Sequence, residues 1–378
     1  EVAVKIPSVE AIPIESGPLL VRVRTDEGIE GIGEAHAGYW KSMKPFIEET
    51  LGSIVIGMDP RDTQLIWDAM FPPTKWIGPG GMQMICMGAI DVACWDIAAK
   101  SVDQPLYRYM SGAARTHLPT YWSTGLAWRA RAQGGVEGDP GTPEALVERM
   151  REGREAGFTA FKLRLEWMNQ RQDVDPEGDI ARFKACKEFL GDECRLSIDI
   201  NNGYSVSTAI EQGLKLQDMG AAHYEEPLPQ YDYAGLKQVV DALDVPVSSG
   251  ELEHTLWNFR DLIEIGDPDI VQPDLLYVGG ITPMRKIFTL CEAFNKPVLP
   301  HGPGAGIQNA VSLHVYSTQV NATLPHEYSW EFNGGLENAT RVFEQGIVPK
   351  DGFVDLPDRP GHGLVVVDEA VEAYRMDK

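Results

Sequence analysis

Acidic and imidazole side chains recur along this chain at a nearly constant step. The intervals between successive residues of the series are 26, 26, 23, 27 and 26 residues. The six members are Asp199, Glu225, Glu251, Asp274, His301 and Glu327. Each ends a short apolar run, and a step of about 25 residues accommodates one strand, one helix and two loops. Charged groups at the carboxyl ends of successive parallel strands predict a barrel whose strand ends share one site.

Eight candidate strands alternate with helix-forming stretches from Pro119 onward. The strand segments are TYWSTG, AFKLRL, RLSIDI, AHYEEP, VPVSSGE, DIVQPD, KPVLPH and HEYSWE. The stretches between them, such as PEALVERMREGREAG and STAIEQGLKLQDMG, place apolar residues at helical spacing. This alternation predicts a parallel sheet with helical crossovers, and eight such units predict closure into a barrel.

The chain before the barrel follows a different pattern. LLVRVR, TDEG and IEGIGEA predict a β-hairpin, and helical stretches follow it, of which MICMGAIDVACWDIAAKSV is the longest. We therefore predict a barrel of the α/β class that follows a separate α+β domain. The predicted parts are an N-terminal α+β domain over 1–118, the barrel over 119–335, and a segment over 336–378 that returns to the first domain.

The overall composition excludes several classes of partner. The 378 residues carry a net charge of −23, and no run of Lys or Arg is present that would neutralise phosphates. We therefore expect neither nucleic acid nor a membrane as a partner, and a small anionic substrate only where cations gather locally. No apolar stretch of about 18 residues is apparent, so no transmembrane helix is expected. The five cysteines contain no C-x-x-C motif, and we expect reduced thiols in a cytoplasmic protein.

Three members of the series predict a metal site. Asp199, Glu225 and Glu251 end three consecutive strands with equal spacing. Three carboxylates at one point do not all stay ionised without a cation, because like charges raise each other's pKa. A single strand-end acid is more simply explained as a helix cap or a surface charge, but three in register favour metal binding. Oxygen ligands select a hard ion, and Mg²⁺ fits.

The other charged strand residues predict acid–base chemistry. Lys162 and Arg164 share one face of the strand FKLRL, and two buried cations require anions beside them. Asp274 and His301 end neighbouring strands, so the carboxylate can orient the imidazole while the second ring nitrogen moves a proton. Glu327 ends the last strand, where it could accept a hydrogen bond from a substrate, and Glu331 is an alternative residue for this role. His326 alternates to the outer face.

These motifs, taken together, resemble one known family over residues 19 to 330. GIGEA, AIDVACWDIAAKSVDQPLYRYMSG, FKLRL, SIDINNG, YEEP, SSGE, QPDLLYVGGIT and LPHGP follow one another in its order. The family is the mandelate racemase / muconate lactonising enzyme group of the enolase superfamily. The resemblance implies a modified TIM barrel, (β/α)₇β, with the N-terminal α+β domain as its capping domain, and an essential Mg²⁺, one per subunit. We also expect a homo-oligomer.

The resemblance also implies a role for each matching residue. Asp199, Glu225 and Glu251 would be the metal ligands, Asp274 and His301 the acid–base dyad, and Glu327 an assisting group. Asn201 matches a substrate-contacting position. Within the family, SSGELEHT, QPDLLYVGG and LPHGP are most similar to acid-sugar dehydratases of the rhamnonate type. By that likeness His254 would face the site as a substrate-binding residue or as the acid for the leaving hydroxyl, although a surface histidine explains it equally well.

The implied reaction begins with proton abstraction next to a carboxylate. The metal, Lys162 and Arg164 would stabilise the resulting enediolate, His301 would take the proton, and loss of the β-hydroxyl would give a 2-keto-3-deoxy acid. Racemisation or epimerisation is a second hypothesis, cycloisomerisation a third, and a non-catalytic metal-binding protein a remote fourth. Arg164 argues against racemisation, because two-base racemases carry Lys there and Arg keeps its proton near neutral pH.

The capping domain departs from the family pattern in one segment. IPIESGPLL, which joins the first two strands, is too short for the loop that covers the substrate in relatives. The residues that set substrate specificity are therefore not defined by that loop. By position alone, the candidates in the capping domain are His36, Tyr39, Trp40 and Trp76.

Overall fold

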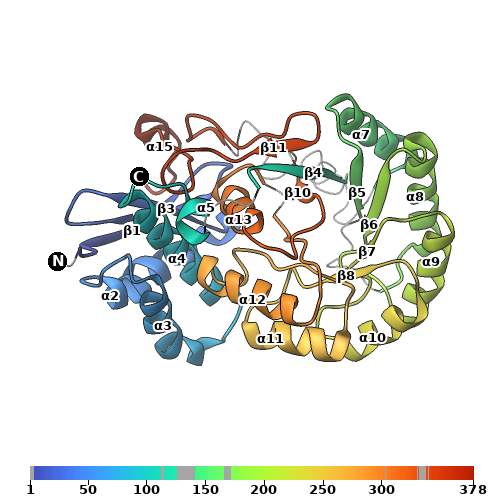
Figure 1. Ribbon diagram of the computed structural model, residues 1–378, viewed down its shortest axis with the longest axis horizontal. Helices are drawn as coiled ribbons and strands as arrows, with labels where there is room; N and C mark the ends of the chain where they lie inside the picture. The colour runs from blue at the N-terminus through green and yellow to red at the C-terminus, as the bar shows by residue number, and fades with distance from the viewer. Residues whose placement is uncertain are drawn as a thin grey trace.

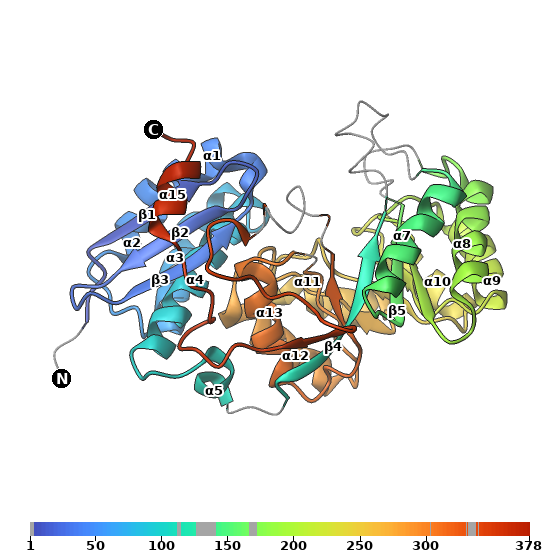
Figure 2. The same ribbon diagram turned by 90° about the horizontal axis from the view of Figure 1, so that it is seen from above.

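A computed structural model gives the fold of the chain. It describes residues 4–111, 115–125, 141–165, 172–302, 304–329, 331, 338 and 340–378. In Figures 1 and 2 the N-terminal domain lies beside a larger body of strands and helices, and the C-terminal segment runs from that body back to the first domain. The predicted α/β class with an α+β capping domain is confirmed.

The capping domain is an antiparallel sheet covered by helices. Its sheet has the order β1 (Ser8–Pro13), β2 (Leu19–Arg24) and β3 (Glu30–Ala35). The helices are η1 (Ala37–Tyr39), α1 (Trp40–Pro45), η2 (Phe46–Leu51), α2 (Gly52–Val55), α3 (Thr63–Thr74), η3 (Lys75–Ile77), α4 (Met82–Lys100) and α5 (Leu106–Ser111). The turn between β1 and β2 is tight, since the Gly17 N–H donates to the Ile14 carbonyl at 3.0 Å. The predicted hairpin and the short first connection are both confirmed.

Helix α4 packs directly on β3 through glycines. A Cβ at Gly31 or Gly33 would lie 2.0 and 1.8 Å from carbonyl oxygens of α4, so only glycine allows this approach. Asp96 of α4 is fully buried, accepts the Ile32 N–H at 3.1 Å, and pairs with Lys100 at 2.7 Å. The GIGEA and AIDVACWDIAAK motifs are therefore two halves of one packing contact.

The same helix corrects one expectation. Met82–Lys100 is long and apolar enough to cross a membrane by length and composition, although no such stretch was expected from the sequence. The structure buries 94% of its most apolar window inside the protein. Its apolar character is explained by contacts with β3 on one side and the barrel on the other, which is the ordinary environment of a core helix.

The barrel strands lie in the predicted order. The parallel sheet runs β10 (His326–Tyr328), β4 (His117–Thr124), β5 (Ala160–Arg164), β6 (Arg195–Asp199), β7 (Tyr224–Glu225), β8 (Val247–Ser249) and β9 (Ile270–Val271). Beyond β9, parallel bridges join Val271 to Val298 and Asp274 to His301. Each of the eight predicted strand segments therefore supplies a strand or a bridge, with β10 at one end of the strand order and the 298–301 segment beyond β9 at the other. Figure 1 shows β4 to β8 as neighbours in this curved sheet.

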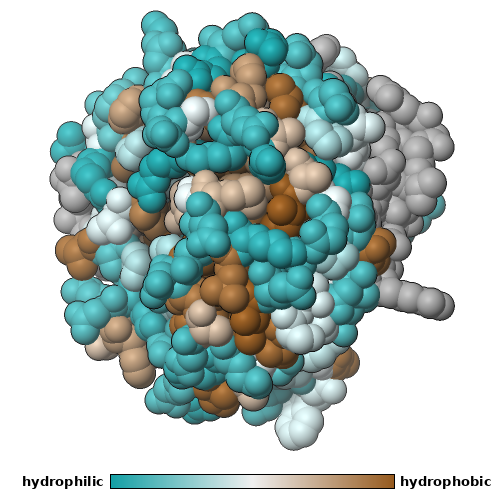
Figure 3. Space-filling model, turned by 90° about the vertical axis from the view of Figure 1, so that its right-hand side faces the viewer, coloured by the Kyte–Doolittle hydropathy of each residue, from teal (hydrophilic) through white to brown (hydrophobic). Residues whose placement is uncertain are grey.

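Helices cover the outside of this sheet. They are α7 (Pro143–Glu155), α8 (Pro176–Leu190), α9 (Val206–Asp218), α10 (Tyr233–Ala242), α11 (Leu256–Asp261), η4 (Leu262–Gly266), α12 (Ile281–Ala293) and α13 (Ile307–Ser317). Side chains of Thr142, Asp175, Asp232 and Thr255 accept backbone N–H bonds at helix starts, which fixes where these helices begin. The face drawn in Figure 3 is mostly hydrophilic with apolar side chains between, as expected for helices that bury one side.

The C-terminal segment contacts both domains. β11 (Phe353–Asp355) pairs with β4 of the barrel, and α15 (Asp368–Tyr374) lies near β1 of the capping domain (Figure 2). Ile14 bridges Arg375, and the Glu15 N–H donates to the Tyr374 carbonyl at 2.9 Å. The predicted boundary at 335–336 lies outside the described residues.

Candidate active site

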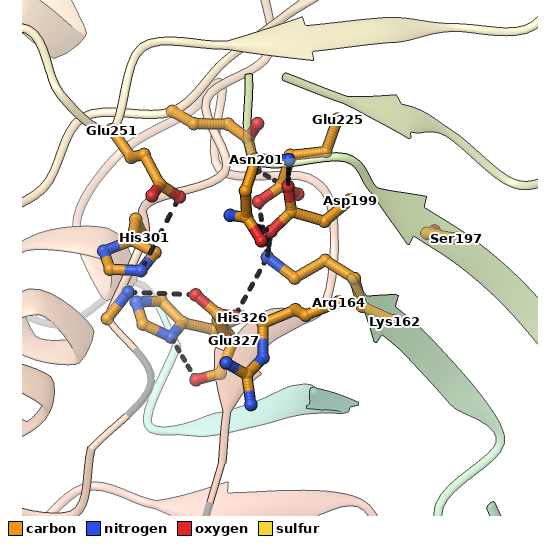
Figure 4. A network of polar contacts seen from close by, with 12 residues as sticks. Lys162, Arg164, Ser197, Asp199, Asn201, Glu225, Glu251, His301, His326 and Glu327 are labelled. Atoms are coloured by element: carbon orange, nitrogen blue, oxygen red, sulfur yellow. Dashed lines mark hydrogen bonds and ion pairs between the residues drawn. The ribbon is translucent and has the colours of Figure 1, made fainter. Parts of the chain in front are cut away.

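Three buried carboxylates meet where β6, β7 and β8 end. One oxygen from each of Asp199, Glu225 and Glu251 lies within 4.8 Å of the others. Asp199 and Glu225 are neighbours in strand register, and Glu251 follows β8 by two residues. Figure 4 shows the three side chains pointing toward one another from adjacent strands. The structure thus brings together the three residues that the sequence assigned to a metal site.

Lys162 supplies a positive charge to this cluster. Its Nζ donates to Glu225, lies 3.0 Å from Glu327 Oε1 and 3.7 Å from Asp199 Oδ2, and is fully buried. Burial alone would lower the pKa of Lys162, but the Glu225 and Glu327 carboxylates raise it well above its usual value. Burial would likewise raise the pKa of Glu225, but Lys162 and His223 lower it below its usual range.

The other two acids are not compensated to the same degree. Burial and the charge of Glu225 raise the pKa of Asp199 well above its usual value. Burial raises that of Glu251, and His301 only partly offsets the effect. One ammonium group therefore faces more carboxylate charge than it neutralises, and a divalent cation with oxygen ligands would remove the excess. The donor set of Asp199, Glu225 and Glu251 fits Mg²⁺.

Further buried polar side chains form hydrogen bonds that hold the Glu225 carboxylate in place. Glu225 Oε2 accepts from Gln272 Nε2 at 2.8 Å and lies 3.1 Å from His223 Nε2. His223 Nδ1 in turn lies 2.7 Å from Ser197 Oγ. These side chains are buried inside the barrel. Sequence reasoning missed them, although alternation along the strands places residues 197, 223 and 272 two positions before Asp199, Glu225 and Asp274.

The predicted dyad is formed across the β9 edge. His301 Nδ1 lies 2.6 Å from Asp274 Oδ2, and His301 Nε2 lies 3.6 Å from Glu251 Oε2. Burial alone would lower the pKa of His301, but the carboxylates of Glu251 and Asp274 raise it to about 10. The imidazole therefore presents one nitrogen to its orienting acid and the other to the three-carboxylate cluster, as Figure 4 shows for Glu251.

Glu327 and Glu331 take different positions. Glu327 is fully buried, and its Oε2 accepts the Gly302 N–H at 3.2 Å while Oε1 faces Lys162. Burial would raise its pKa, but Lys162 and His301 lower it to about 2. Glu331 instead binds Arg164, whose Nη2 donates to Oε2 at 2.9 Å, and accepts the Thr124 hydroxyl. Lys162 thus contacts Glu327, and Arg164 contacts Glu331.

Asn201 and His254, the two other predicted substrate contacts, form hydrogen bonds with other groups of the protein. Asn201 donates through its backbone N–H and side-chain Nδ2 to Asp199, at 2.8 and 3.0 Å. His254 Nε2 accepts the Gly81 N–H at 3.2 Å, and Nδ1 lies 3.1 Å from the Tyr277 carbonyl oxygen. His254 therefore joins the capping domain to the loop after Asp274. Its role toward a substrate stays a prediction, as does that of Asn201.

The four capping residues selected by position have different surroundings. Desolvation lowers the pKa of His36, and the charge of Asp274 partly offsets this effect. The ring centroid of His36 lies 5.4 Å from that of Tyr39. Tyr39 is 66% exposed and Trp76 is 83% exposed. His36 is therefore close enough to Asp274 for its charge to act on the imidazole, and all four assignments remain predictions.

His326 points away from these groups. Its ring nitrogens lie 2.9 Å from Ser312 Oγ and 3.0 Å from the Glu327 carbonyl oxygen, and its ring packs edge-on against Tyr316. Burial lowers its pKa to about 4. Strand alternation had placed it on the outer face, and the contacts with Ser312 and Tyr316 of α13 agree with that placement.

Comparisons with known proteins agree with this architecture. Residues 14–111 match the family described as "Mandelate racemase / muconate lactonizing enzyme, N-terminal domain", and residues 145–371 match "Enolase C-terminal domain-like". A mandelate racemase/muconate lactonizing protein from Paracoccus denitrificans, solved in complex with magnesium, is 32% identical. It superposes with a TM-score of 0.91, and the match covers 99% of each chain.

Curated relatives carry names from two reaction types. Arabinonate dehydratase of Saccharolobus solfataricus is 28% identical, over 93% of this chain and 89% of that protein. D-galactarolactone cycloisomerase of Agrobacterium fabrum is also 28% identical, over 95% and 91%. An L-rhamnonate dehydratase from Saccharopolyspora erythraea matches at 28% over 92% and 83%. With both domains matched and the strand-end residues assembled as predicted, the chain belongs to the mandelate racemase / muconate lactonizing enzyme family of the enolase superfamily.

Proposed function

We propose that this enzyme is a Mg²⁺-dependent dehydratase of an acid sugar, an aldonate or aldarate. The observation that carries the proposal is the placement of the His301–Asp274 dyad beside the three-carboxylate cluster, with His301 Nε2 3.6 Å from Glu251. A proton acceptor and a cation-binding cluster at this separation suit proton abstraction next to a substrate carboxylate. The dehydratase names among the relatives support the same reaction.

The cation would be held by Asp199, Glu225 and Glu251. When bound, it supplies positive charge that stabilises the negative charge developing on the substrate carboxylate. It would also neutralise part of the carboxylate charge beside His301. Because Glu251 is a main cause of the raised pKa of His301, that pKa would then fall toward the neutral range, where an imidazole accepts protons efficiently.

The protein's own groups divide the remaining work. Lys162, beside Glu327, and Arg164, beside Glu331, would place positive charge near a substrate carboxylate. His301, oriented through Nδ1 by Asp274, accepts the proton from carbon 2 at Nε2. The 3-hydroxyl leaves as water after receiving a proton from His301 or a second acid, and the resulting enol becomes a 2-keto-3-deoxy acid.

Cycloisomerisation is the second candidate, because relatives with that name match as closely as the dehydratases. It begins with the same proton abstraction, so the site geometry is compatible with both. Racemisation is less well supported. Arg164 is buried and paired with Glu331, and a guanidinium does not serve as a base on the face opposite His301.

A library of aldonic acids, aldaric acids and their lactones, incubated with enzyme and Mg²⁺, tests the proposal. Formation of a 2-keto acid, detected as its semicarbazone, is the expected result. Product mass and a parallel incubation in D₂O separate the alternatives: a 2-keto acid lighter than its substrate by one water supports dehydration, an isomer of unchanged mass supports cycloisomerisation, and deuterium at an inverted carbon 2 without a 2-keto acid supports racemisation. An isomer of unchanged mass, or inversion at carbon 2, without any product that has lost water would overturn the dehydratase proposal.

The five cysteines bear on the compartment. All are buried and none is in a disulfide, and burial raises the pKa of Cys86, Cys186 and Cys291 to about 12. Neutral buried thiols suit a reducing environment. We therefore propose the cytoplasm, and a small anionic acid sugar as the partner of the site. A homo-oligomer remains a proposal that sedimentation would test.

A further inference from the structure

The carboxylate of Asp274 is held by four donors. Oδ1 accepts the N–H groups of Leu276 and Tyr277 at 2.7 and 3.1 Å. Oδ2 receives His301 Nδ1 at 2.6 Å and, at the same distance, Gln308 Nε2. Gln308 therefore shares with His301 the one oxygen that orients the imidazole. A side chain in that position controls the direction of the dyad hydrogen bond.

Gln308 lies in the first turn of α13, which begins five residues after Gly302. Its neighbour Asn309 donates through Nδ2 to the Gly302 carbonyl and, at 3.2 Å, to the Glu327 carbonyl. One helical turn thus contacts the dyad through residue 308 and the Glu327 strand through residue 309. The position of this turn relative to the barrel fixes both groups.

The capping domain holds the same turn in place. Glu34, near the end of β3, is buried, and its Oε2 accepts the Gln308 N–H at 3.1 Å. The Ile307 N–H also bonds to this carboxyl group. A carboxylate at a helix N-terminus satisfies N–H groups that lack partners within the helix. Burial disfavours the charged form of this carboxyl group and raises the pKa of Glu34 to about 7.

The close approach favours a glycine. A Cβ on Gly306 would lie 2.9 Å from Glu34 Oε2, so a larger residue would shift the end of the Glu34 side chain. The contact from β3 to α13 is therefore built from a buried acid and a residue without a side chain. Such an arrangement exceeds what helix capping alone needs, since an exposed Ser or Asp at the cap position suffices for that.

We propose that Gln308 is a positioning residue that aligns Asp274 against His301, and that Glu34 of the capping domain sets Gln308 through the first turn of α13. The capping domain then does more than cover the substrate: its docking orients the dyad. Gln308 acts on the proton acceptor through Asp274. The kinetic part of the test rests on the proposed function, whereas the spectroscopic part does not.

The spectroscopic arm uses the full chain without substrate. In ¹H and ¹⁵N NMR of protein labelled at histidine nitrogens, the low-field Nδ1–H signal of His301 is assigned by its loss in His301→Asn. We expect Gln308→Leu to shift this signal, and Glu34→Ala and Gly306→Ala to shift it in the same direction. Gln238→Leu, which removes an exposed glutamine of α10, is the matched control and leaves it in place. An unmoved signal in Gln308→Leu would overturn the proposal.

The kinetic arm uses whichever aldonate or aldarate the library identifies. Gln308→Leu should lower kcat about 10- to 100-fold, the usual range for a group that orients a ligand or base from behind. KM and the Kd for Mg²⁺ should change less than about twofold, because Gln308 is not placed among the metal ligands. A raised KM with unchanged kcat would instead make Gln308 a substrate contact and reject its positioning role.

The link to the capping domain has its own test. Glu34→Gln keeps an oxygen that accepts the Gln308 N–H, so it should restore most of the kcat and signal position lost in Glu34→Ala. If Glu34→Ala behaves like wild type while Gln308→Leu does not, the role of the capping domain is rejected. If no acid sugar is turned over, the proposed function fails, and the NMR comparison still decides the proposal.

Discussion

The site has two parts whose charges are compensated differently: the metal half (Asp199, Glu225 and Glu251) and the acid–base half (Asp274 and His301). In the metal half, Asp199 and Glu251 are buried among like charges and their pKa values are raised. In the acid–base half, every oxygen of Asp274 has two donors, and the imidazole beside it is held in one orientation. The first half carries carboxylate charge that a bound cation would neutralise, whereas the second is already organised by protein groups. Metal affinity and proton transfer should therefore respond to different substitutions.

His301→Asn is expected to give the largest difference between the effect on turnover and the effect on Mg²⁺ binding. Loss of the proton acceptor should lower kcat by about 10⁴-fold, the upper part of the range for a positioned acid–base group. The metal half is left intact, so the Kd for Mg²⁺ measured by calorimetry should stay within a few-fold. His117→Asn, at an exposed histidine paired with Asp355, is the control for loss of an imidazole. Turnover retained in His301→Asn would remove this residue from the mechanism.

Glu251→Gln should break the metal half instead. At Mg²⁺ concentrations of 100 times Kd, the wild type gains about 2.7 kcal/mol of unfolding free energy from binding. The variant should lose most of that gain while its metal-free stability does not fall, because a buried carboxylate with a raised pKa has been removed. Thermal melts with and without Mg²⁺ measure both quantities, and Glu264→Gln on the exposed side of η4 is the control. A wild-type Mg²⁺ effect in Glu251→Gln would contradict the ligand assignment.

His326 tests the pH response of a group just outside both halves. Its folded pKa of about 4 lies below the unfolded value of about 6.5, so the unfolded chain binds more protons between these values. This contribution to stability is present above pH 6.5 and is lost as the pH falls. From pH 7 to 5 we expect wild type to lose about 2 kcal/mol more than His326→Gln, because other buried histidines such as His314 titrate in both proteins. Urea titrations at both pH values measure it, and parallel losses in the two proteins would refute the assignment.

The smallest effect is expected beneath the metal half. His223→Phe keeps the volume of the side chain but removes the group 3.1 Å from Glu225 Oε2. Gln272 and Lys162 still hold Glu225, so we expect the Kd for Mg²⁺ to rise only about 10-fold. His223→Gln, which keeps a donor, should recover part of the affinity. Unchanged Mg²⁺ binding in His223→Phe would show that Gln272 and Lys162 suffice.

Several parts of the site were accessible from the sequence because they repeat with the strands. Asp199, Glu225, Glu251, Asp274 and His301 each end an apolar run, and parallel strands bring such ends to one edge. The glycines of GIGEA and the residues of AIDVACWDIAAK signal a close helix–sheet contact, and the structure shows its reason in the 1.8 and 2.0 Å clashes that a Cβ would make. The sequence predicts the long apolar helix Met82–Lys100, but its length and composition also fit a spanning helix, and its burial inside the protein is what the structure adds.

Other parts have no local signal. Nothing near Gln308 in the sequence indicates that it shares an oxygen of Asp274 with His301, because Gln308 and Asp274 are 34 positions apart. The start of the helix that contains Gln308 contacts Glu34, which is 274 positions away in the chain. The same holds for His254, whose ring nitrogens contact Gly81 and Tyr277.

The sequence by itself determined the order of the strands, the site residues that each strand end carries, and the family. These follow from periodic spacing, because each βα unit repeats the same geometry along the chain. Only the tertiary structure decided which charges are compensated, which glutamate pairs with Lys162 or Arg164, and which side chains hold the dyad. Those outcomes depend on burial and on distances between residues far apart in the chain, and spacing along a sequence contains neither quantity.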